Sequence, residues 1–203
     1  MPGSAWVNER KNEFYYRKAK AENLRSRASF KLLQAVKRYN FIKPGYVVVD
    51  LGAAPGGWTL AALRLVEDSG FVLAVDLKDI KPFDAPNALA IVGDVTQQET
   101  IQKILQLLPH DPDIVISDVA PNVSGTWELD HARQIDLATQ SLKIATSLLR
   151  PGGNFFVKVF QGSLTSEFIK ETKRHFSFVK LVKPKASRNK SAELYVLAMN
   201  FRQ

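Results

Sequence analysis

Short apolar runs alternate with helical patterns from residue 46 onward, and this alternation constrains the fold more than any other feature. Strands are predicted over residues 46–51, 71–76, 88–92, 113–118 and 154–160, and helices over 58–66, 97–108, 129–149 and 163–176. Such an order is typical of an α/β fold, in which helices cover both faces of a mostly parallel sheet. The near-continuous apolar runs fit strands that are buried on both faces.

Both ends of the chain add to this predicted sheet. Residues 178–182 and 193–199 are predicted strands joined by a basic loop without a helical pattern. Because parallel neighbours need a crossover, this pair is expected to be antiparallel. Residues 1–43 are predicted to be a basic helical extension, with a helix over 27–39 and Ser26 as its N-cap. We expect residues 1–203 to form a single domain.

A glycine-rich turn follows the first predicted strand and leads into a helix. A turn of this kind allows close backbone approach to a ligand, with the N–H groups of the helix start pointing at it. Gly52, Gly56 and Gly57 do not have the G-x-G-x-x-G spacing of dinucleotide-binding folds. The turn therefore predicts a nucleotide or nucleoside site and argues against a nicotinamide-dependent dehydrogenase.

Two acids follow the next two predicted strands, where open α/β sheets bind ligands. Asp76 closes the second strand, and Asp94 follows the third. The first is placed to accept both ribose hydroxyls of an adenosine, and the second to meet the adenine amino group. The alternative for either acid alone is a helix cap or a turn residue.

The positive charge of the chain is concentrated near its two ends. Residues 1–43 hold 11 Lys or Arg against 3 Glu, residues 44–171 hold 9 against 16 acids, and residues 172–190 hold 7 basic residues and no acid. A fold that brings the basic stretches together makes one face for a polyanion, with nucleic acid the leading candidate. The alternative is a pair of solvated basic tails. Phe14, Tyr15, Tyr16 and Phe30 lie among these charges and can stack on bases or anchor a helix.

The composition excludes several other classes. With 0 Cys and 3 scattered His, the chain offers neither disulfides nor a ligand cluster, so no metal is expected. No long apolar run predicts a membrane span or a secretory signal, and we expect a soluble, cytoplasmic protein. The sequence gives no indication of the oligomeric state.

Charged residues at the ends of the later strands point to catalysis. Asp118 ends the fourth predicted strand, Lys158 lies inside the fifth, and Glu193 opens the last. A buried lysine is rare unless it is paired, although a lysine at a sheet edge can extend its charged end to water. A binding module without catalytic activity gives no reason for these charges at the ends of the strands.

The chain resembles the FtsJ family of ribosomal RNA large subunit 2′-O-methyltransferases. The resemblance covers nearly the whole chain and rests on YRKAK (16–20), LRSRASFKL (24–32), DLGAAPGGW (50–58), SDVAPNVSG (117–125), FVKVFQG (156–162), SR (187–188) and ELYV (193–196). It implies a Rossmann-like methyltransferase fold, with a seven-stranded, mostly parallel sheet and an antiparallel last strand. It also implies S-adenosylmethionine as methyl donor and a catalytic tetrad of Lys31, Asp118, Lys158 and Glu193.

The resemblance and the residues together predict three sets of contacts. The cofactor set is Gly52, Pro55, Gly56, Gly57, Trp58, Asp76, Asp94 and Asp118, and the RNA set is Arg25, Arg27, Lys185 and Arg188. The resemblance further implies a uridine in the A loop of large-subunit ribosomal RNA as the target. A transfer RNA anticodon loop and a non-catalytic RNA-binding module are the alternatives.

A ribose hydroxyl is a poor nucleophile, so the protein must align it and remove its proton. We expect Lys158 to accept that proton. Lys31 is expected to tune Lys158 electrostatically or to contact the target nucleotide, while Asp118 and Glu193 orient the lysines and the ribose.

Overall fold

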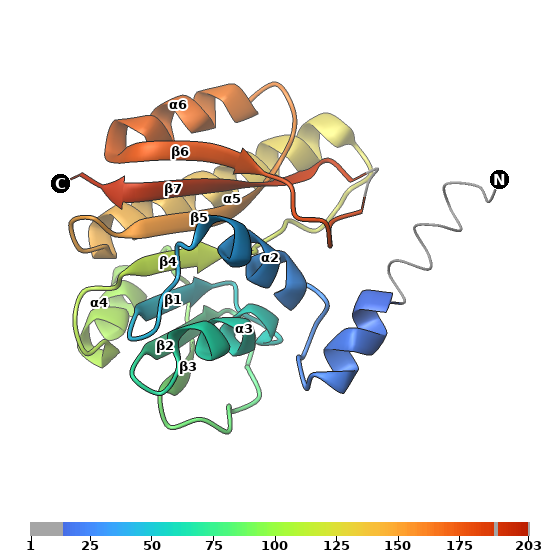
Figure 1. Ribbon diagram of the computed structural model, residues 1–203. Coiled ribbons are helices and arrows are strands. Elements are labelled where there is room, and N and C mark those ends of the chain that lie inside the picture. The colour runs from blue at the N-terminus through green and yellow to red at the C-terminus, as the bar shows by residue number, and fades with distance from the viewer. Residues whose placement is uncertain (1–13, 189–190, 203) are drawn as a thin grey trace.

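A seven-stranded sheet in the order β3-β2-β1-β4-β5-β7-β6 forms the centre of the computed structural model, which describes residues 14–188 and 191–202 (Figure 1). The strands are β1 (Val47–Leu51), β2 (Phe71–Asp76), β3 (Ala88–Val92), β4 (Ile114–Ser117), β5 (Asn154–Phe160), β6 (Phe176–Val182) and β7 (Glu193–Phe201). β7 is antiparallel to both β5 and β6, while β1 to β5 pair in parallel. The predicted fold class and the antiparallel last strand are confirmed.

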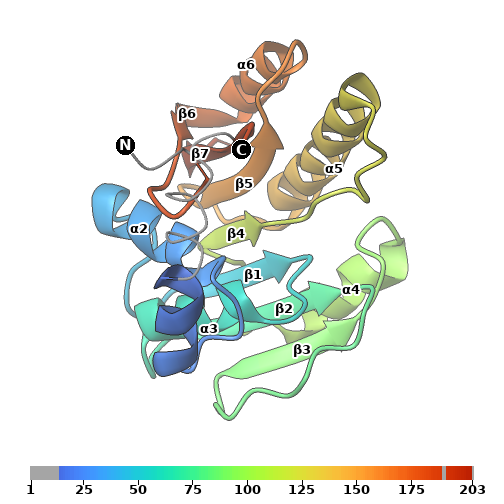
Figure 2. The same cartoon turned by 90° about the vertical axis from the view of Figure 1, so that its right-hand side faces the viewer.

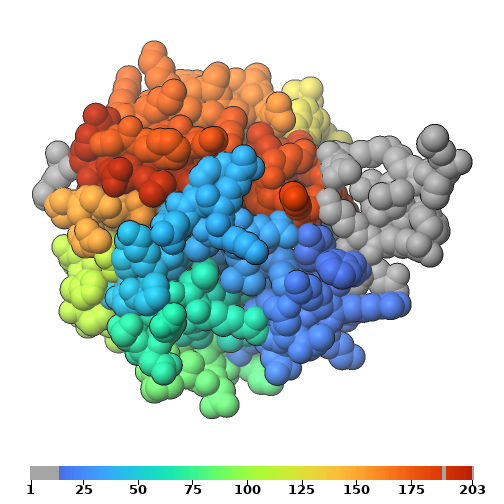
Figure 3. Space-filling model, in the orientation of Figure 1, coloured from blue at the N-terminus to red at the C-terminus, as the bar shows by residue number. Residues whose placement is uncertain are grey.

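Side chains of the central strands alternate between two apolar layers. Val48, Ile116 and Phe156 are buried with the helices α2 (Ser29–Tyr39) and α3 (Gly57–Val66). Val49 and Val115 are buried on the other face with α4 (Gln98–Leu107), α5 (Trp127–Leu148) and α6 (Thr165–His175). Figure 2 shows these two groups of helices on opposite sides of the sheet, and in Figure 3 α2 lies across the middle of its face. No helix of the described ranges is long and apolar enough to cross a membrane.

The edge strand β3 is more exposed than its apolar run predicted. Leu89 and Val92 are 41% and 54% exposed, so the expectation that all five strands are covered on both faces is wrong for β3. The cause is its connection, because residues 77–87 join β2 to β3 as a loop and bring no helix to cover the edge.

The start of α2 also differs from the prediction. The helix begins at Ser29, and its N-cap position is Ala28, with no side-chain hydrogen bond there. Ser26 is therefore not the N-cap. Ser29 Oγ instead donates to the carbonyl of Gly57 at 2.7 Å, so a nearby hydroxyl connects α2 to α3.

The two basic stretches meet in the folded protein. Residues 14–21 are helical, and Ala19 and Phe30 share a small apolar cluster with Ala186 from the loop before β7. Gln34 bridges the two ends, since its Nε2 donates to Tyr15 Oη and its Oε1 accepts from the Ala186 N–H, each at 2.9 Å. The aromatic residues here divide into anchors and exposed rings, with Phe30 buried but Phe14 and Tyr16 exposed.

Phe156 packs at the centre of the face that carries α2 and α3, so Phe156→Ala should destabilise the fold. Its ring centroid lies 5.0 to 5.5 Å from those of Phe41, Trp58 and Tyr195. We expect a loss of about 3–5 kcal/mol in the free energy of unfolding, measured by denaturant titration. Phe178→Ala, at a half-exposed ring on β6, is the matched control and should cost far less. Equal losses for the two variants would contradict this placement of the core.

Candidate active site

Strand direction brings four charged residues to one edge of the sheet. Asp118 directly follows β4, and Lys158 lies near the end of β5. Because β7 runs antiparallel to β5, its first residue, Glu193, pairs with Phe160 at the edge where the parallel strands end. Lys31 comes from the first turn of α2. The structure thus brings together all four residues of the predicted tetrad, while their catalytic role stays a prediction.

The four residues form two ion pairs. Lys158 Nζ lies 3.2 Å from Asp118 Oδ1 and also donates to the Asp118 backbone carbonyl. Lys31 Nζ lies 2.7 and 2.8 Å from the two carboxylate oxygens of Glu193. Between the pairs, Tyr195 Oη donates to Asp118 Oδ1 at 2.9 Å. The Lys158 side chain is 7% exposed, so this cation lies inside the protein and not at a solvated edge.

Burial and charge set the protonation of the acid and the phenol in this cluster. Burial would raise the pKa of Glu193, but the Lys31 ammonium, the nearby Lys158 and the Ser187 hydroxyl together hold that pKa below its usual range. Burial, followed by the nearby Asp118 and Glu193 carboxylates, raises the pKa of Tyr195 well above its usual value. Glu193 is therefore a carboxylate at neutral pH, and Tyr195 remains a hydrogen-bond donor.

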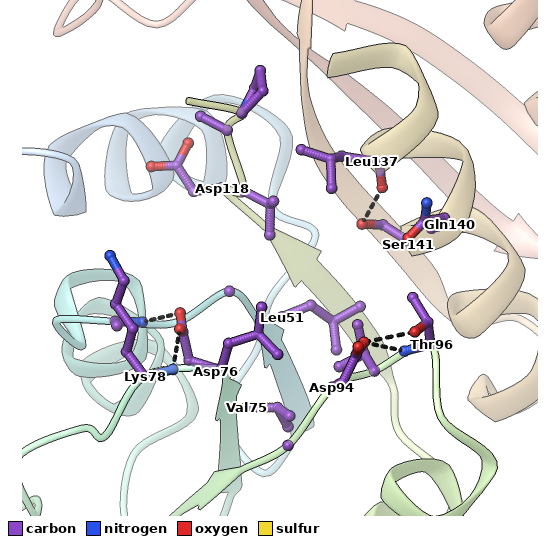
Figure 4. A pocket seen from close by; sticks show the side chains of 18 of the residues that line it. Leu51, Val75, Asp76, Lys78, Asp94, Thr96, Asp118, Leu137, Gln140 and Ser141 are labelled. Atoms are coloured by element: carbon purple, nitrogen blue, oxygen red, sulfur yellow. Dashed lines mark hydrogen bonds between the residues drawn. The ribbon is translucent and has the colours of Figure 1, made fainter. Parts of the chain in front are cut away.

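A cavity of about 630 Å³ opens beside Asp118 at the carboxyl ends of the parallel strands (Figure 4). Its lining includes Gly52, Asp76, Asp94 and Asp118 from the predicted cofactor set. The size is that of a small-molecule site. Asp76 and Asp94 lie on one side of the cavity in Figure 4, and Gln140 and Ser141 of α5 lie on another.

Asp76 and Asp94 also hold the backbone at the cavity rim. Asp76 accepts the N–H groups of Ala54 and Lys78 at 2.9 and 2.8 Å. Asp94 Oδ1 accepts from both the backbone N–H and the hydroxyl of Thr96, and these bonds lower the pKa of Asp94. Asp94 is therefore a turn residue, the alternative that the sequence left open, and it also lines the cavity.

The second half of the glycine-rich turn contacts the N-terminal segment. Pro55, Gly56, Gly57 and Trp58 are not among the residues that line the described cavity, and their contact with a cofactor stays a prediction. Gly56 has a φ of +99°, and a Cβ there would lie 2.8 Å from Arg25 Nη1. Trp58 is buried, and its Nε1 donates to the Ala28 carbonyl at 2.9 Å. A side chain at position 56 would therefore be strained and would displace Arg25.

Arg25 connects the turn to the loop after β2. Its guanidinium donates to the carbonyls of Pro55, Lys81 and Pro82 at 3.2, 2.6 and 2.6 Å and lies 4.4 Å from the ring centroid of Phe83. The sequence predicted an RNA contact for Arg25, and the structure gives its guanidinium an intramolecular role. Every residue has a backbone carbonyl, so nothing in the sequence marks these three as the acceptors, and sequence reasoning could not find this role.

The other predicted RNA contacts lie close to Glu193 or on the loop before it. Burial, and then the nearby Arg188, lower the pKa of Arg27, whereas Glu193 opposes this effect. Lys185 and Arg188 are exposed. Positive groups thus flank the Lys31–Glu193 pair, and their contact with RNA stays a prediction.

Asp50 is a buried acid to which the sequence reasoning gave no role. It lies in β1 at 1% exposure, where Thr59 Oγ1 donates to its Oδ2 at 2.7 Å and its Oδ1 has no hydrogen-bond partner. Burial raises the pKa of Asp50 to about 7, and the nearby Asp118 and Asp76 add to the effect. Among the described residues, no group of three or more His, Cys, Asp or Glu is arranged to hold a metal ion.

Comparisons with known structures agree with this arrangement. A Plasmodium falciparum protein named a ribosomal RNA methyltransferase matches with a TM-score of 0.75 and 27% identity, over 87% of this chain and 98% of its own. An S-adenosylmethionine-dependent O-methyltransferase from Thermotoga maritima, at 13% identity and a TM-score of 0.57, covers 84% of this chain and 65% of its own and shows the fold alone. The fold defines a Rossmann-like methyltransferase. The family model described as FtsJ-like methyltransferase matches residues 24–201, and the chain belongs to that family.

Curated relatives are similar over nearly the whole chain. A protein of Methanocaldococcus jannaschii named ribosomal RNA large subunit methyltransferase E is 50% identical over 97% of this chain and 81% of its own. The protein of that name from Methanothermobacter thermautotrophicus is 48% identical over 98% of this chain and 95% of its own.

Asp50→Asn should change how stability depends on pH. The raised pKa means that the folded protein binds this proton more tightly than the unfolded chain, so the contribution is present below about pH 4 and is lost as the pH rises to about 7. The free energy of unfolding of the parent relative to Asp50→Asn should thus fall across this window, by a few kcal/mol in order of magnitude. Denaturant titrations at pH 5 and 8 measure it, and parallel pH profiles would show that Asp50 does not titrate there.

Arg25→Ala should loosen both segments that its guanidinium joins. Loss of three hydrogen bonds from a charged donor should speed amide hydrogen exchange in residues 77–87 and 53–57 by at least about tenfold. Hydrogen-exchange mass spectrometry measures this, with Arg38→Ala on the exposed side of α2 as the matched control. Unchanged exchange in Arg25→Ala would contradict the connecting role.

Proposed function

We propose that the chain is an S-adenosylmethionine-dependent RNA 2′-O-methyltransferase that acts on a uridine in the A loop of large-subunit ribosomal RNA. The convergence of Lys31, Asp118, Lys158 and Glu193 beside the cavity carries this proposal. Relatives about 50% identical and named for large-subunit ribosomal RNA support the substrate, and the position of the basic stretches on one side supports a polyanion. A cytoplasmic location belongs to the same proposal.

The cavity fits the adenosine part of such a cofactor. It lies at the carboxyl ends of parallel strands, where α/β sheets bind nucleosides, and Asp76 and Asp94 supply acceptors for ribose hydroxyls and an adenine amino group. Asp118 lies where the cavity meets the tetrad, so it is placed to face the positive end of the cofactor. When bound, S-adenosylmethionine supplies a methyl group on a positively charged sulfur.

The residues of the chain must then hold the ribose and remove its proton. Lys158 Nζ would accept the proton of the 2′-hydroxyl when that hydroxyl reacts. Asp118 orients Lys158 through their 3.2 Å contact. Glu193 holds Lys31 near the Tyr195 ring, 5.8 Å from the centroid, where Lys31 adds a positive charge to the site.

The test is methyl transfer in purified components. The protein, labelled S-adenosylmethionine and large ribosomal subunits that lack the modification should give one 2′-O-methylated uridine in the A loop. Transfer RNA from the same cells is the second substrate. Methyl transfer to an anticodon loop, or a base-methylated product, would overturn the proposal.

Lys158 gives the sharpest test of the chemistry. Lys158→Ala should retain cofactor binding but lose about 10²–10⁴ in the single-turnover rate, because general base catalysis is typically of that size. Lys158→Arg keeps the positive charge but cannot give up its proton, so it should be nearly as inactive. Substantial recovery in Lys158→Arg would show that the role of Lys158 is electrostatic.

A further inference from the structure

Trp127 is an exposed aromatic residue that the proposed chemistry does not use. It is the first residue of α5 and is 45% exposed, whereas Trp58 is almost completely buried. Its indole stacks on two other rings, with centroids 5.8 Å from His131 and 6.0 Å from Phe160 and interplanar angles of 13° and 23°. One part of the indole thus packs on the protein while much of it remains open to solvent.

The rings beneath Trp127 are fixed by packing. His131 is buried, and its Nε2 accepts the Leu164 N–H at 3.1 Å. A Cβ at Gly162 would lie 2.6 Å from that nitrogen, so the imidazole packs directly against the backbone. Asp130 accepts hydrogen bonds from Ser124 and from the Gly125 N–H, which secure the loop leading into α5. The indole therefore rests on a rigid base, and ordering it on binding costs little entropy.

Three observations connect Trp127 to the tetrad. The loop that begins after Asp118 ends at Trp127. Phe160, on which the indole stacks, is two residues beyond Lys158 and pairs with Glu193 across β5 and β7. Figure 1 shows the start of α5 on the side of the sheet to which the parallel strands point, together with the loop before β7. A nucleotide whose ribose reaches Lys158 thus has its own base, or that of its neighbour, near this indole.

We propose that Trp127 is a stacking platform for an unpaired nucleobase of the RNA, at or next to the target nucleotide. This inference rests on the proposed function and names a contact for its substrate. Aromatic side chains bind single-stranded RNA by stacking on base faces. Phosphates are poorly suited to this position, because Glu128 follows Trp127 directly and Glu128 and Asp130 lie in the same helical turn. Arg27 and Arg188 are the basic residues near Glu193, and the phosphates of the RNA backbone fit there instead.

The experiment uses the full chain and an RNA hairpin with the A-loop sequence of large-subunit ribosomal RNA. Trp127→Ala should raise the KM for the hairpin about 5- to 100-fold, the range typical of one lost base stack, with cofactor affinity unchanged. Trp127→Phe keeps a ring and should recover most of the loss, whereas Trp127→Leu should not. Phe178→Ala, which removes a similarly exposed ring on β6, is the matched control and should leave KM unchanged.

Abasic nucleotides locate the stacked base. Removing one base at or beside the target should weaken binding to the parent protein and have no further effect on Trp127→Ala, because both changes remove the same contact. The proposal fails if no position behaves in this way, if Trp127→Ala binds the hairpin like the parent, or if Trp127→Leu matches Trp127→Phe. It also fails if RNA binding is unchanged while Trp127→Ala turns a dimer into a monomer in sedimentation, since the surface then meets a second copy.

A separate measurement distinguishes this failure from failure of the proposed function. Oligouridylate should quench the fluorescence of Trp127 in a Trp6→Phe background, with Trp6→Phe/Trp127→Phe as the blank, and this signal needs no methyl transfer. If ribosomal RNA is not methylated but oligouridylate quenches Trp127, the proposed target is wrong and the platform stands. If ribosomal RNA is methylated and no quenching occurs, the platform is wrong.

Discussion

The pairing of a buried and a partly buried lysine with two acids is the constraint on which the rest of the structure depends. A charge removed from water is tolerated only when an opposite charge and further hydrogen bonds compensate it, and breaking one such pair leaves the other charge uncompensated. Lys158 pairs with Asp118, and Lys31 pairs with Glu193, so each pair joins two different parts of the fold. The strand order meets this requirement. Only a reversed β7 between β5 and β6 puts the start of that strand, with Glu193, at the edge where Asp118 follows β4.

The glycine-rich turn connects the N-terminal segment to the cavity. Arg25 occupies the space beside Gly56 that a side chain would need, Ser29 donates to the Gly57 carbonyl, and Trp58 donates to the Ala28 carbonyl. The same α2 carries Lys31 into the tetrad. The N-terminal segment, the glycine-rich turn and the helix that carries Lys31 are thus one packed unit. Arg25 also connects this unit to the loop after β2.

Sequence periodicity predicted the strands whose ends are set by burial. It did not predict contacts that depend on hydrogen bonds to backbone carbonyls. The bounds of β2, β3 and β5 match the prediction, because apolar runs end where strands leave the core. A partner for Lys158 was predictable because a charge inside an apolar strand needs one, whereas the place of Lys31 in the tetrad was predicted only through the family resemblance. The exposure of β3 follows from a connection that holds no helix, which the sequence pattern shows but whose effect on burial was not drawn from it. The roles of Arg25 and Ser29 depend on carbonyl acceptors, which leave no mark in the sequence.

Tyr195 is the second partner of the acid that holds Lys158. A carboxylate removed from water needs hydrogen-bond donors as well as an opposite charge. Asp118 Oδ1 lies 3.2 Å from Lys158 Nζ and also accepts the Tyr195 hydroxyl at 2.9 Å. Because the pKa of Tyr195 lies well above its usual value, this donor keeps its proton at neutral pH and shares the negative charge of Asp118 at all times. Asp118 thus has two fixed partners, the Lys158 ammonium and the Tyr195 hydroxyl, which together set its orientation. The phenol therefore joins β7 to the Lys158–Asp118 pair in one hydrogen-bonded cluster.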